Sequence, residues 1–448
     1  MKQYRLKIFL VISAAYIISY FHRAAPAVVG PELANDLGFA PEQIGLIGSM
    51  YFWAYALTGL PSGILSDTWG ARKTVSAFVL LAAFGSLFFG LASSAALLSI
   101  GRFAIGLGVG VVYVAALKIF SEWYRPDELA TCSGILLGVG NVGALLSTAP
   151  LVLFMGSVGW RYTFVGIAGL TLVLSWLSYK IIRNRPSDMG FAPVQPLLQN
   201  QGKSQTVTLK KAVATVFSNK KIYLLGALLF SYYGALMGVG SLWAGPFMRE
   251  ALYIPPKAVG GILMMFPLGM ILGCPLAGYL SDKILHSRKK VLLFGGVLHL
   301  SSYCWLVFYS QGLSVSWLHA LFFWYGLTGS AFVACFACAK EIYQTGVAGT
   351  AVGAINTFLF LGGAFYQFVI GLIIGRLSDA LNPESIMGAY RAGLSVPVIG
   401  LVIGLIIFSF FKEASSEGYG ESRKEAVLTE TDSTSIDPEA ANLALAKR

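Results

Sequence analysis

The chain has 448 residues, which in a soluble protein would suggest two or three domains. Its composition excludes that class, because hydrophobic residues make up 56% and charged residues 12%, against about 45–50% and about 25% in soluble domains. A net charge of +11 would suggest nucleic acid as the partner of a soluble domain. Here the basic residues follow the ends of apolar runs, so the sequence predicts a multi-pass protein of the lipid bilayer with no nucleic-acid partner.

A helix that crosses the roughly 30 Å apolar layer of a bilayer needs about 20 apolar residues. Twelve such runs predict an all-α membrane protein with twelve transmembrane helices. They cover residues 8–30, 43–65, 74–93, 97–120, 130–153, 160–182, 222–247, 258–280, 291–310, 315–338, 348–374 and 392–411. The first run extends to Pro31, which is too long for a signal peptide, so we expect it to remain as helix one.

Breaks in composition divide the chain into four expected parts. Two six-helix bundles, 1–182 and 222–411, are joined by a basic linker, 183–221, and followed by a polar tail, 412–448, that we expect to be disordered. Lys and Arg are concentrated before helix one, in the linker and after every second helix. The positive-inside rule therefore predicts that both termini are cytoplasmic.

The two halves repeat one motif at the same place in each six-helix unit. Gly63-Ile-Leu-Ser-Asp67 precedes Arg72, and Gly278-Tyr-Leu-Ser-Asp282 precedes Arg288. The aspartates can accept hydrogen bonds from the start of a neighbouring helix, and the following basic residues anchor the loop in the cytoplasm. We expect Asp67, Arg72, Asp282 and Arg288 to act in gating or coupling.

With these motifs the sequence resembles the major facilitator superfamily over residues 5–411. The stretch Gly101-Arg102-Phe-Ala-Ile-Gly106 on helix four is similar to the Arg-and-glycine motif of that family. The resemblance implies two six-helix bundles that alternately open a shared cavity, working as a monomer. Helix five has Ala149 before Pro150 instead of the Gly-Pro pair of drug–proton antiporters. This departure weakens the interpretation as a drug exporter, and efflux of multiple drugs or metabolites by proton antiport is kept as the alternative to uptake.

Shorter matches indicate which transporters of that family the chain resembles most. Phe21-His-Arg23-Ala-Ala-Pro26 resembles bacterial organic-solute permeases, and Ser241-Leu-Trp243-Ala-Gly-Pro246 resembles intraphagosomal amino-acid transporters. They imply a secondary active or facilitative transporter of the bacterial inner membrane that moves a small polar solute, either an amino acid or an organic anion. A coupling proton is a further expected partner.

Arg23 is the most informative candidate for solute contact, because a charge at membrane depth is costly and needs a reason. Tyr16, Ser19, Tyr20 and Arg23 recur at helical spacing and share one face of helix one. The guanidinium could hold a carboxylate or phosphate through paired hydrogen bonds, or it could extend to the outer lipid headgroups. Both interpretations are open at this point.

Other candidates are polar or aromatic residues within the predicted spans, and packing between helices is the alternative role for each of them. For solute contact they are Tyr20, Tyr51, Tyr55, Tyr113, Asn141, Tyr232, Tyr233, Trp243, Asn356 and Gln367. For coupling or gating they include His22, whose unperturbed pKa lies near 6.5, and Arg102, which belongs to the helix-four motif.

The sequence offers no machinery for ATP hydrolysis or for catalysis. It contains no phosphate-binding loop, no His-Glu-x-x-His, and no Asp or Glu in the middle of a span. Cys335 and Cys338 have metal-site spacing but no second pair, so neither a metal nor another cofactor is predicted. A membrane enzyme, a sensor and a channel remain rival classes, and exchange or facilitated diffusion remains open beside proton coupling.

Overall fold

The computed structural model describes residues 1–192, 194, 209–343, 345–378 and 383–413. Residues Met1–Phe411 form one compact unit. Almost all of Lys412–Arg448, which was predicted to be a disordered tail, and the run 195–208 of the predicted linker lie outside the described residues. Within Met1–Phe411, residues 1–192 are called the first half and residues 209–411 the second half.

The first half consists of helices and short helical turns. They are α1 (Lys2–Ala24), α2 (Pro26–Leu37), α3 (Pro41–Leu65), η1 (Ser66–Gly70), α4 (Ala71–Leu91), α5 (Ala95–Gly110), α6 (Val112–Trp123), α7 (Pro126–Leu146), α8 (Ala149–Ile181) and η2 (Pro186–Met189).

The second half continues the same pattern. Its elements are α9 (Leu209–Ser218), α10 (Lys220–Gly238), η3 (Val239–Trp243), α11 (Ala244–Pro246), η4 (Phe247–Ala251), α12 (Pro256–Tyr279), η5 (Leu280–Ile284), α13 (Arg288–Cys304), η6 (Trp305–Tyr309), α14 (Val315–Gly329), η7 (Ser330–Val333), α15 (Ala334–Ile342), α16 (Thr345–Leu377) and α17 (Pro383–Ser409).

Many of these elements are consecutive pieces of longer, broken helices. Among the described residues, ten helical stretches are long and apolar enough to cross a membrane, and α7 adds a shorter apolar stretch, Thr131–Leu146. With 25 residues, α3 is also long enough to cross a bilayer. Gly159, at φ 79°, kinks α8 and joins two helices there, and both belong to Ala149–Ile181, which is already one of the ten stretches. The arrangement fits the predicted all-α fold with twelve transmembrane helices.

The helix starts follow from local chemistry. Pro41 and Pro256 each stand in the first turn of a helix, where the missing N–H costs no hydrogen bond. Ser94, Ser287 and Ser314 cap α5, α13 and α14, because each side-chain oxygen accepts a hydrogen bond from the main-chain N–H three residues later.

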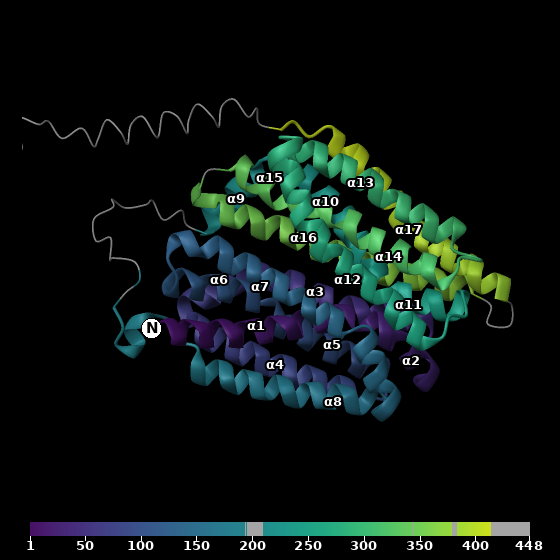
Figure 1. Ribbon diagram of the computed structural model, residues 1–448, viewed down its shortest axis with the longest axis horizontal. Helices are drawn as coiled ribbons and strands as arrows, with labels where there is room; N and C mark the ends of the chain where they lie inside the picture. The colour runs from purple at the N-terminus through teal and green to yellow at the C-terminus, as the bar shows by residue number, and fades with distance from the viewer. Residues whose placement is uncertain (193, 195–208, 344, 379–382, 414–448) are drawn as a thin grey trace, which may run out of the picture. The chain divides into compact units, whose positions relative to one another are not determined.

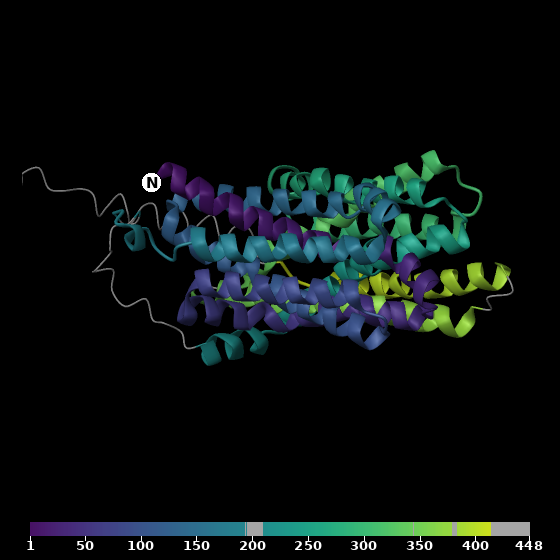
Figure 2. The same cartoon turned by 90° about the horizontal axis from the view of Figure 1, so that it is seen from below.

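The halves of Met1–Phe411 meet along several helices. In Figure 1 the helices of the first half (purple to blue) and those of the second half (green to yellow) form two groups, and Figure 2 shows them from below. Helix α3 packs along α16, α2 packs on η3 and α11, and α12 packs on α7 and α8. At Gly245 of α11 a Cβ atom would lie 1.6 Å from the carbonyl oxygen of Ala27. Glycine is therefore required where α2 and α11 meet.

Candidate functional site

Arg23, near the end of α1, lies inside the protein with only 7% of its surface exposed. Its guanidinium carbon stands 4.4 Å from the ring centre of Tyr20, 5.2 Å from that of Tyr55 and 5.3 Å from that of Phe360. Such contacts between a cation and aromatic faces are favourable and partly offset the loss of water. The side chain is therefore enclosed by protein and does not extend to lipid headgroups.

The surroundings of Arg23 come from both halves of the chain. Tyr20 and Tyr55 belong to α1 and α3, whereas Tyr233 and Phe360 belong to α10 and α16. The Arg23 guanidinium donates a hydrogen bond of 3.3 Å to the Tyr233 hydroxyl. The Tyr55 and Phe360 rings stack at 4.0 Å, so the site is built where α3 and α16 meet.

The charge of Arg23 has no partner of opposite sign in the described part of the chain. No ion pair joins it to an acidic side chain there, and its Nε has no hydrogen-bond partner although it is buried. A buried cation with an open donor is costly unless an acceptor completes it. We refer to Arg23, Tyr20, Tyr55, Tyr233 and Phe360 as the Arg23 cluster.

A row of tyrosines continues from the Arg23 cluster. The Tyr20 ring meets the Tyr16 ring edge-on at 5.0 Å, and Tyr16 stacks on Tyr113 of α6 at 5.6 Å. Tyr20 and Tyr113 are partly exposed, whereas Tyr16 is buried. The predicted candidates Tyr20 and Tyr113 are thus linked to Arg23 by aromatic contacts.

Arg102, Tyr51 and His22 form a second buried group beside the Arg23 cluster. Arg102 donates a hydrogen bond of 2.7 Å to the carbonyl oxygen of His22, and its guanidinium lies 4.9 Å from the Tyr51 ring centre. The Tyr51 hydroxyl donates to the carbonyl oxygen of Ser19 at 3.0 Å. Both ring nitrogens of His22 are buried without partners in the described structure. The side chains of Arg102 and Tyr51 therefore both donate hydrogen bonds to main-chain carbonyl groups of α1.

The remaining solute-binding candidates lie in other surroundings. Tyr232 donates to the Thr328 carbonyl oxygen at 2.7 Å, inside the second half. The Trp243 indole donates to the main-chain oxygen of Gln367 at 2.8 Å, and the Gln367 amide donates to Ser241 at 2.9 Å. The Asn141 amide donates to the Leu137 carbonyl oxygen of its own helix at 3.1 Å. Asn356 is partly exposed on α16.

The repeated motif residues make contacts within their own halves. Asp67 forms an ion pair of 3.1 Å with Lys118 of α6. Asp282 pairs with Arg288, which also binds Glu341 at 3.1 Å. Arg72 donates to the Tyr179 carbonyl oxygen at 2.8 Å. We call the end of the molecule that carries these residues the Asp67 end. Their predicted role in gating or coupling stays a prediction, because the contacts seen here do not join the two halves.

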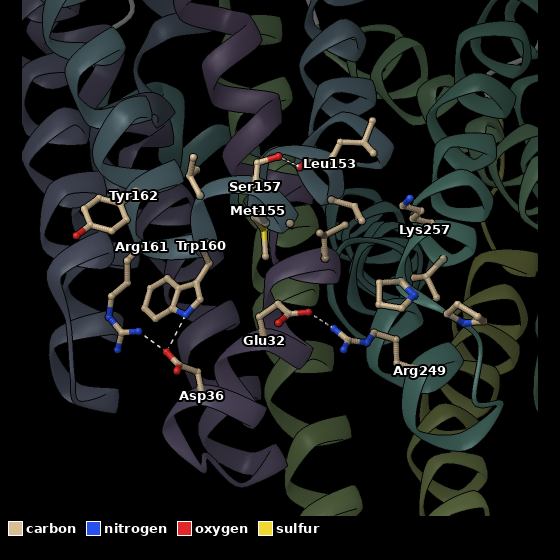
Figure 3. Close-up of a pocket in the computed structure, with 18 of the residues that line it drawn as sticks. Glu32, Asp36, Leu153, Met155, Ser157, Trp160, Arg161, Tyr162, Arg249 and Lys257 are labelled. Atoms are coloured by element: carbon tan, nitrogen blue, oxygen red, sulfur yellow. Dashed lines mark hydrogen bonds and ion pairs between the residues drawn. The ribbon is translucent and has the colours of Figure 1, made fainter.

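The opposite end, called the Glu32 end, carries an ion pair between the halves. Glu32 of α2 accepts a hydrogen bond from Arg249 of η4, and Asp36 accepts from Arg161 and from the Trp160 indole (Figure 3). The hydrogen bond from Arg161 lowers the pKa of the Asp36 carboxyl below its ordinary value.

These charged side chains line a cavity of about 950 Å³ at the Glu32 end. Its lining also includes residues 152, 153 and 155–162 of α8 and the first residues of α12. Of the described residues that line it, none is a predicted solute-binding candidate. The cavity is therefore separate from the Arg23 cluster.

Two groups of functional side chains were not predicted from the sequence. Glu32, Asp36 and Arg249 stand in short polar stretches between spans, and their pairing depends on how the helices pack. His299 of α13 is fully buried among the rings of Tyr232, Tyr303 and Tyr325, with Nδ1 at 3.3 Å from the Thr328 hydroxyl. A histidine within the apolar run 291–310 was the signal that could have located this cluster.

Comparisons with known proteins agree with this architecture. A sequence model of the Major Facilitator Superfamily matches residues 12–367. A probable hexose phosphate transport protein of Chlamydia pneumoniae is 25% identical over 89% of this chain and 90% of its own. A hexuronate transporter of Bacillus subtilis is 24% identical over 90% and 96%.

A solved structure shows the same fold. It is a bacterial homologue of the human lysosomal transporter Spinster, in an inward-facing and unoccupied conformation. The TM-score is 0.73 at 17% identity, over 91% of this chain and 97% of that one. The resemblance inferred from the sequence motifs and the predicted twelve-helix fold are confirmed. The chain is a multi-pass membrane protein that belongs to the major facilitator superfamily.

Proposed function

We propose that this chain transports a small organic anion across the membrane and that Arg23 binds the anionic group. The observation that carries the proposal is a buried guanidinium, built in between the two halves, whose charge has no acidic partner among the described residues. A carboxylate or phosphate would supply that charge and accept hydrogen bonds from the open side of the guanidinium.

The positive charge of Arg23 also discriminates among the candidate classes of solute. An amino acid also carries an ammonium group, whose positive charge Arg23 and Arg102 would repel, and no carboxylate contacts Arg23 in the described part of the chain. A cationic drug would be repelled by Arg23 and Arg102, both buried. An organic anion is therefore favoured over an amino acid, and over efflux of cationic drugs. The named relatives, described as hexose phosphate and hexuronate transporters, support this class.

The proposed mechanism is alternating access. The Glu32–Arg249 ion pair and the close contact of Gly245 with Ala27 join the halves at the Glu32 end. At the Asp67 end the ion pairs of Asp67 and Asp282 stay within their own halves. This asymmetry supports a state that is closed at the Glu32 end, from which the halves rock to release those contacts and expose Arg23 on the other side.

We further propose that the Glu32 end faces outward and that both termini lie in the cytoplasm of a bacterial cell, with the protein in the inner membrane. The basic residues near the Asp67 end, such as Arg72, Lys73 and Lys289, support this orientation. The proposed direction is uptake by a monomer, with two six-helix bundles, 1–182 and 222–411, on either side of the site.

The test is a binding and uptake screen with solutes that differ in charge. Purified protein is screened by thermal shift against D-glucuronate, glucose 6-phosphate, sulfoacetate and L-threonine, and uptake of each solute that binds is measured in cells. We expect stabilisation by at least one organic anion and competition among anions. Stabilisation by threonine with no response to any anion would contradict the proposal.

Two neighbouring tyrosines provide a matched pair of variants. Tyr233→Phe removes the hydroxyl that accepts from Arg23, and Tyr232→Phe removes a hydroxyl bound to the Thr328 carbonyl oxygen away from Arg23. Each loses one buried hydrogen bond, which costs about 1 kcal/mol of stability. We expect an altered affinity for the anion only in Tyr233→Phe.

A further inference from the structure

The junction between α1 and α2 lies directly after Arg23 and has an unusual hydrogen-bond pattern. Helix α1 ends at Ala24 and α2 begins at Pro26. In an uninterrupted helix the N–H of residue 26 would donate to the carbonyl oxygen of residue 22. Proline has no N–H, so Pro26 leaves the carbonyl oxygen of His22 without its helical donor.

Arg102 of α5 donates to that same oxygen. Its Nη1 lies 2.7 Å from the His22 carbonyl oxygen, and the side chain is 1% exposed. A buried carbonyl left without a donor is costly, and a charged donor makes a stronger bond than a neutral one. The residue that completes this turn is therefore 80 positions away in the chain.

Packing brings α5 close enough for this contact. Gly106, one helical turn after Arg102, faces α3 so closely that a Cβ atom would lie 2.4 Å from the Tyr51 carbonyl oxygen. Tyr51 in turn donates its hydroxyl to the Ser19 carbonyl oxygen of α1 at 3.0 Å. Two side chains thus fix carbonyl groups in the last two turns of α1, and Arg23 lies in the same segment.

Arg102 also has unused donors on the side of the junction. Its Nε and Nη2 are buried without partners in the described structure. The side chain lines a small cavity together with Pro26, Val29 and Gly30 of α2. The free space, about 10 Å³, is close to what one water molecule needs. Arg102 is thus placed between the last turn of α1 and the first residues of α2.

We propose that Arg102 is a positioning residue: it replaces the main-chain donor that Pro26 removes and thereby fixes the turn of α1 that carries Arg23. The role of Arg102 in solute binding rests on the proposed function of Arg23, whereas its role in holding the turn does not. The pair of Pro26 and Arg102 is a single device, because the arginine is needed only where the proline has opened the helix.

A double-mutant cycle tests this dependence, using wild type, Arg102→Met, Pro26→Ala and the double variant. Hydrogen–deuterium exchange of residues 19–29 reports the turn without any ligand. We expect faster exchange in Arg102→Met and restored protection in the double variant, because an alanine at position 26 has an N–H that can donate to the His22 carbonyl oxygen. Equal exchange in wild type and Arg102→Met, or no restoration in the double variant, would overturn the proposal.

The uptake arm uses D-glucuronate, or whichever anion the screen identifies. Loss of one charge-assisted hydrogen bond predicts about a tenfold rise in KM for Arg102→Met, with Arg102→Lys closer to wild type and the double variant regaining most of the affinity. A purely structural role would lower the amount of folded protein with KM unchanged. If Arg102→Met does not insert, recovery of insertion by Pro26→Ala is the same test. Altered exchange with no anion uptake by wild type would refute the proposed function alone.

Discussion

Replacing Arg23 by Gln should separate solute binding from stability. The wild-type guanidinium is buried without an acidic partner among the described residues, and burial of an ion costs several kcal/mol. Three cation–π contacts with aromatic rings offset about 1 kcal/mol each of this burial cost. The unliganded variant should therefore unfold at a temperature equal to or above that of wild type, because little stabilising energy is lost with the charge.

The affinity for the anion should fall in Arg23→Gln, although the thermal stability does not. Paired charge-assisted hydrogen bonds to a carboxylate contribute about 3 kcal/mol, so Arg23→Gln should weaken anion binding by roughly 100-fold. The assay is a thermal-shift titration of both proteins with the anion identified by screening. Arg23→Lys is the control that keeps the charge and loses the fork geometry, and we expect an intermediate affinity. A variant that unfolds much earlier, yet binds the anion normally, would refute the reasoning.

Three further predictions concern the fold and the Glu32 end. Glu32→Gln should weaken closure at the Glu32 end by about 0.2–1 kcal/mol, seen as faster labelling of a cysteine placed at position 28. The exchanged pair Glu32→Arg with Arg249→Glu should restore wild-type labelling, and unchanged labelling in Glu32→Gln would show that this ion pair does not hold the halves together. Gly106→Ala should destabilise the folded protein by about 1–3 kcal/mol, because its Cβ would lie 2.4 Å from a main-chain oxygen; a normal melting temperature would show that α3 and α5 are not so close. The Asp36–Arg161 bond should stabilise α2 at pH values above the ordinary pKa of Asp, and this stabilisation should disappear as the pH falls through the lowered pKa of Asp36. Asp36→Asn should remove that pH dependence of stability. An unchanged pH profile in the variant would exclude Asp36 as its source.

The sequence was sufficient to locate Arg23 and the face of α1 that carries it. Tyr20 and Arg23 are three residues apart, so helical geometry alone places them together, and the structure brings them within 4.4 Å. Apolar length predicted the membrane-crossing helices because each one is a local property of about 20 residues. Family membership followed from motifs that are also local.

Contacts between distant helices could not be predicted in the same way. Tyr232 and Tyr233 are adjacent, and only the rotation of α10 decides which hydroxyl meets Arg23. The break at Pro26 is visible in the sequence, but the donor that satisfies the opened turn belongs to α5. The Glu32–Arg249 pair joins residues 217 positions apart, so its existence depends on how the two halves pack.

Counterflow in proteoliposomes distinguishes a carrier whose Arg23 site opens to each side in turn from a channel. Vesicles are loaded with the unlabelled organic anion and diluted into medium that contains a trace of the same anion in labelled form. A carrier whose Arg23 site faces each side in turn should accumulate label transiently above equilibrium, and Arg23→Gln should not. Label that only equilibrates in wild type, as through a channel, or equal accumulation in Arg23→Gln, would contradict the account.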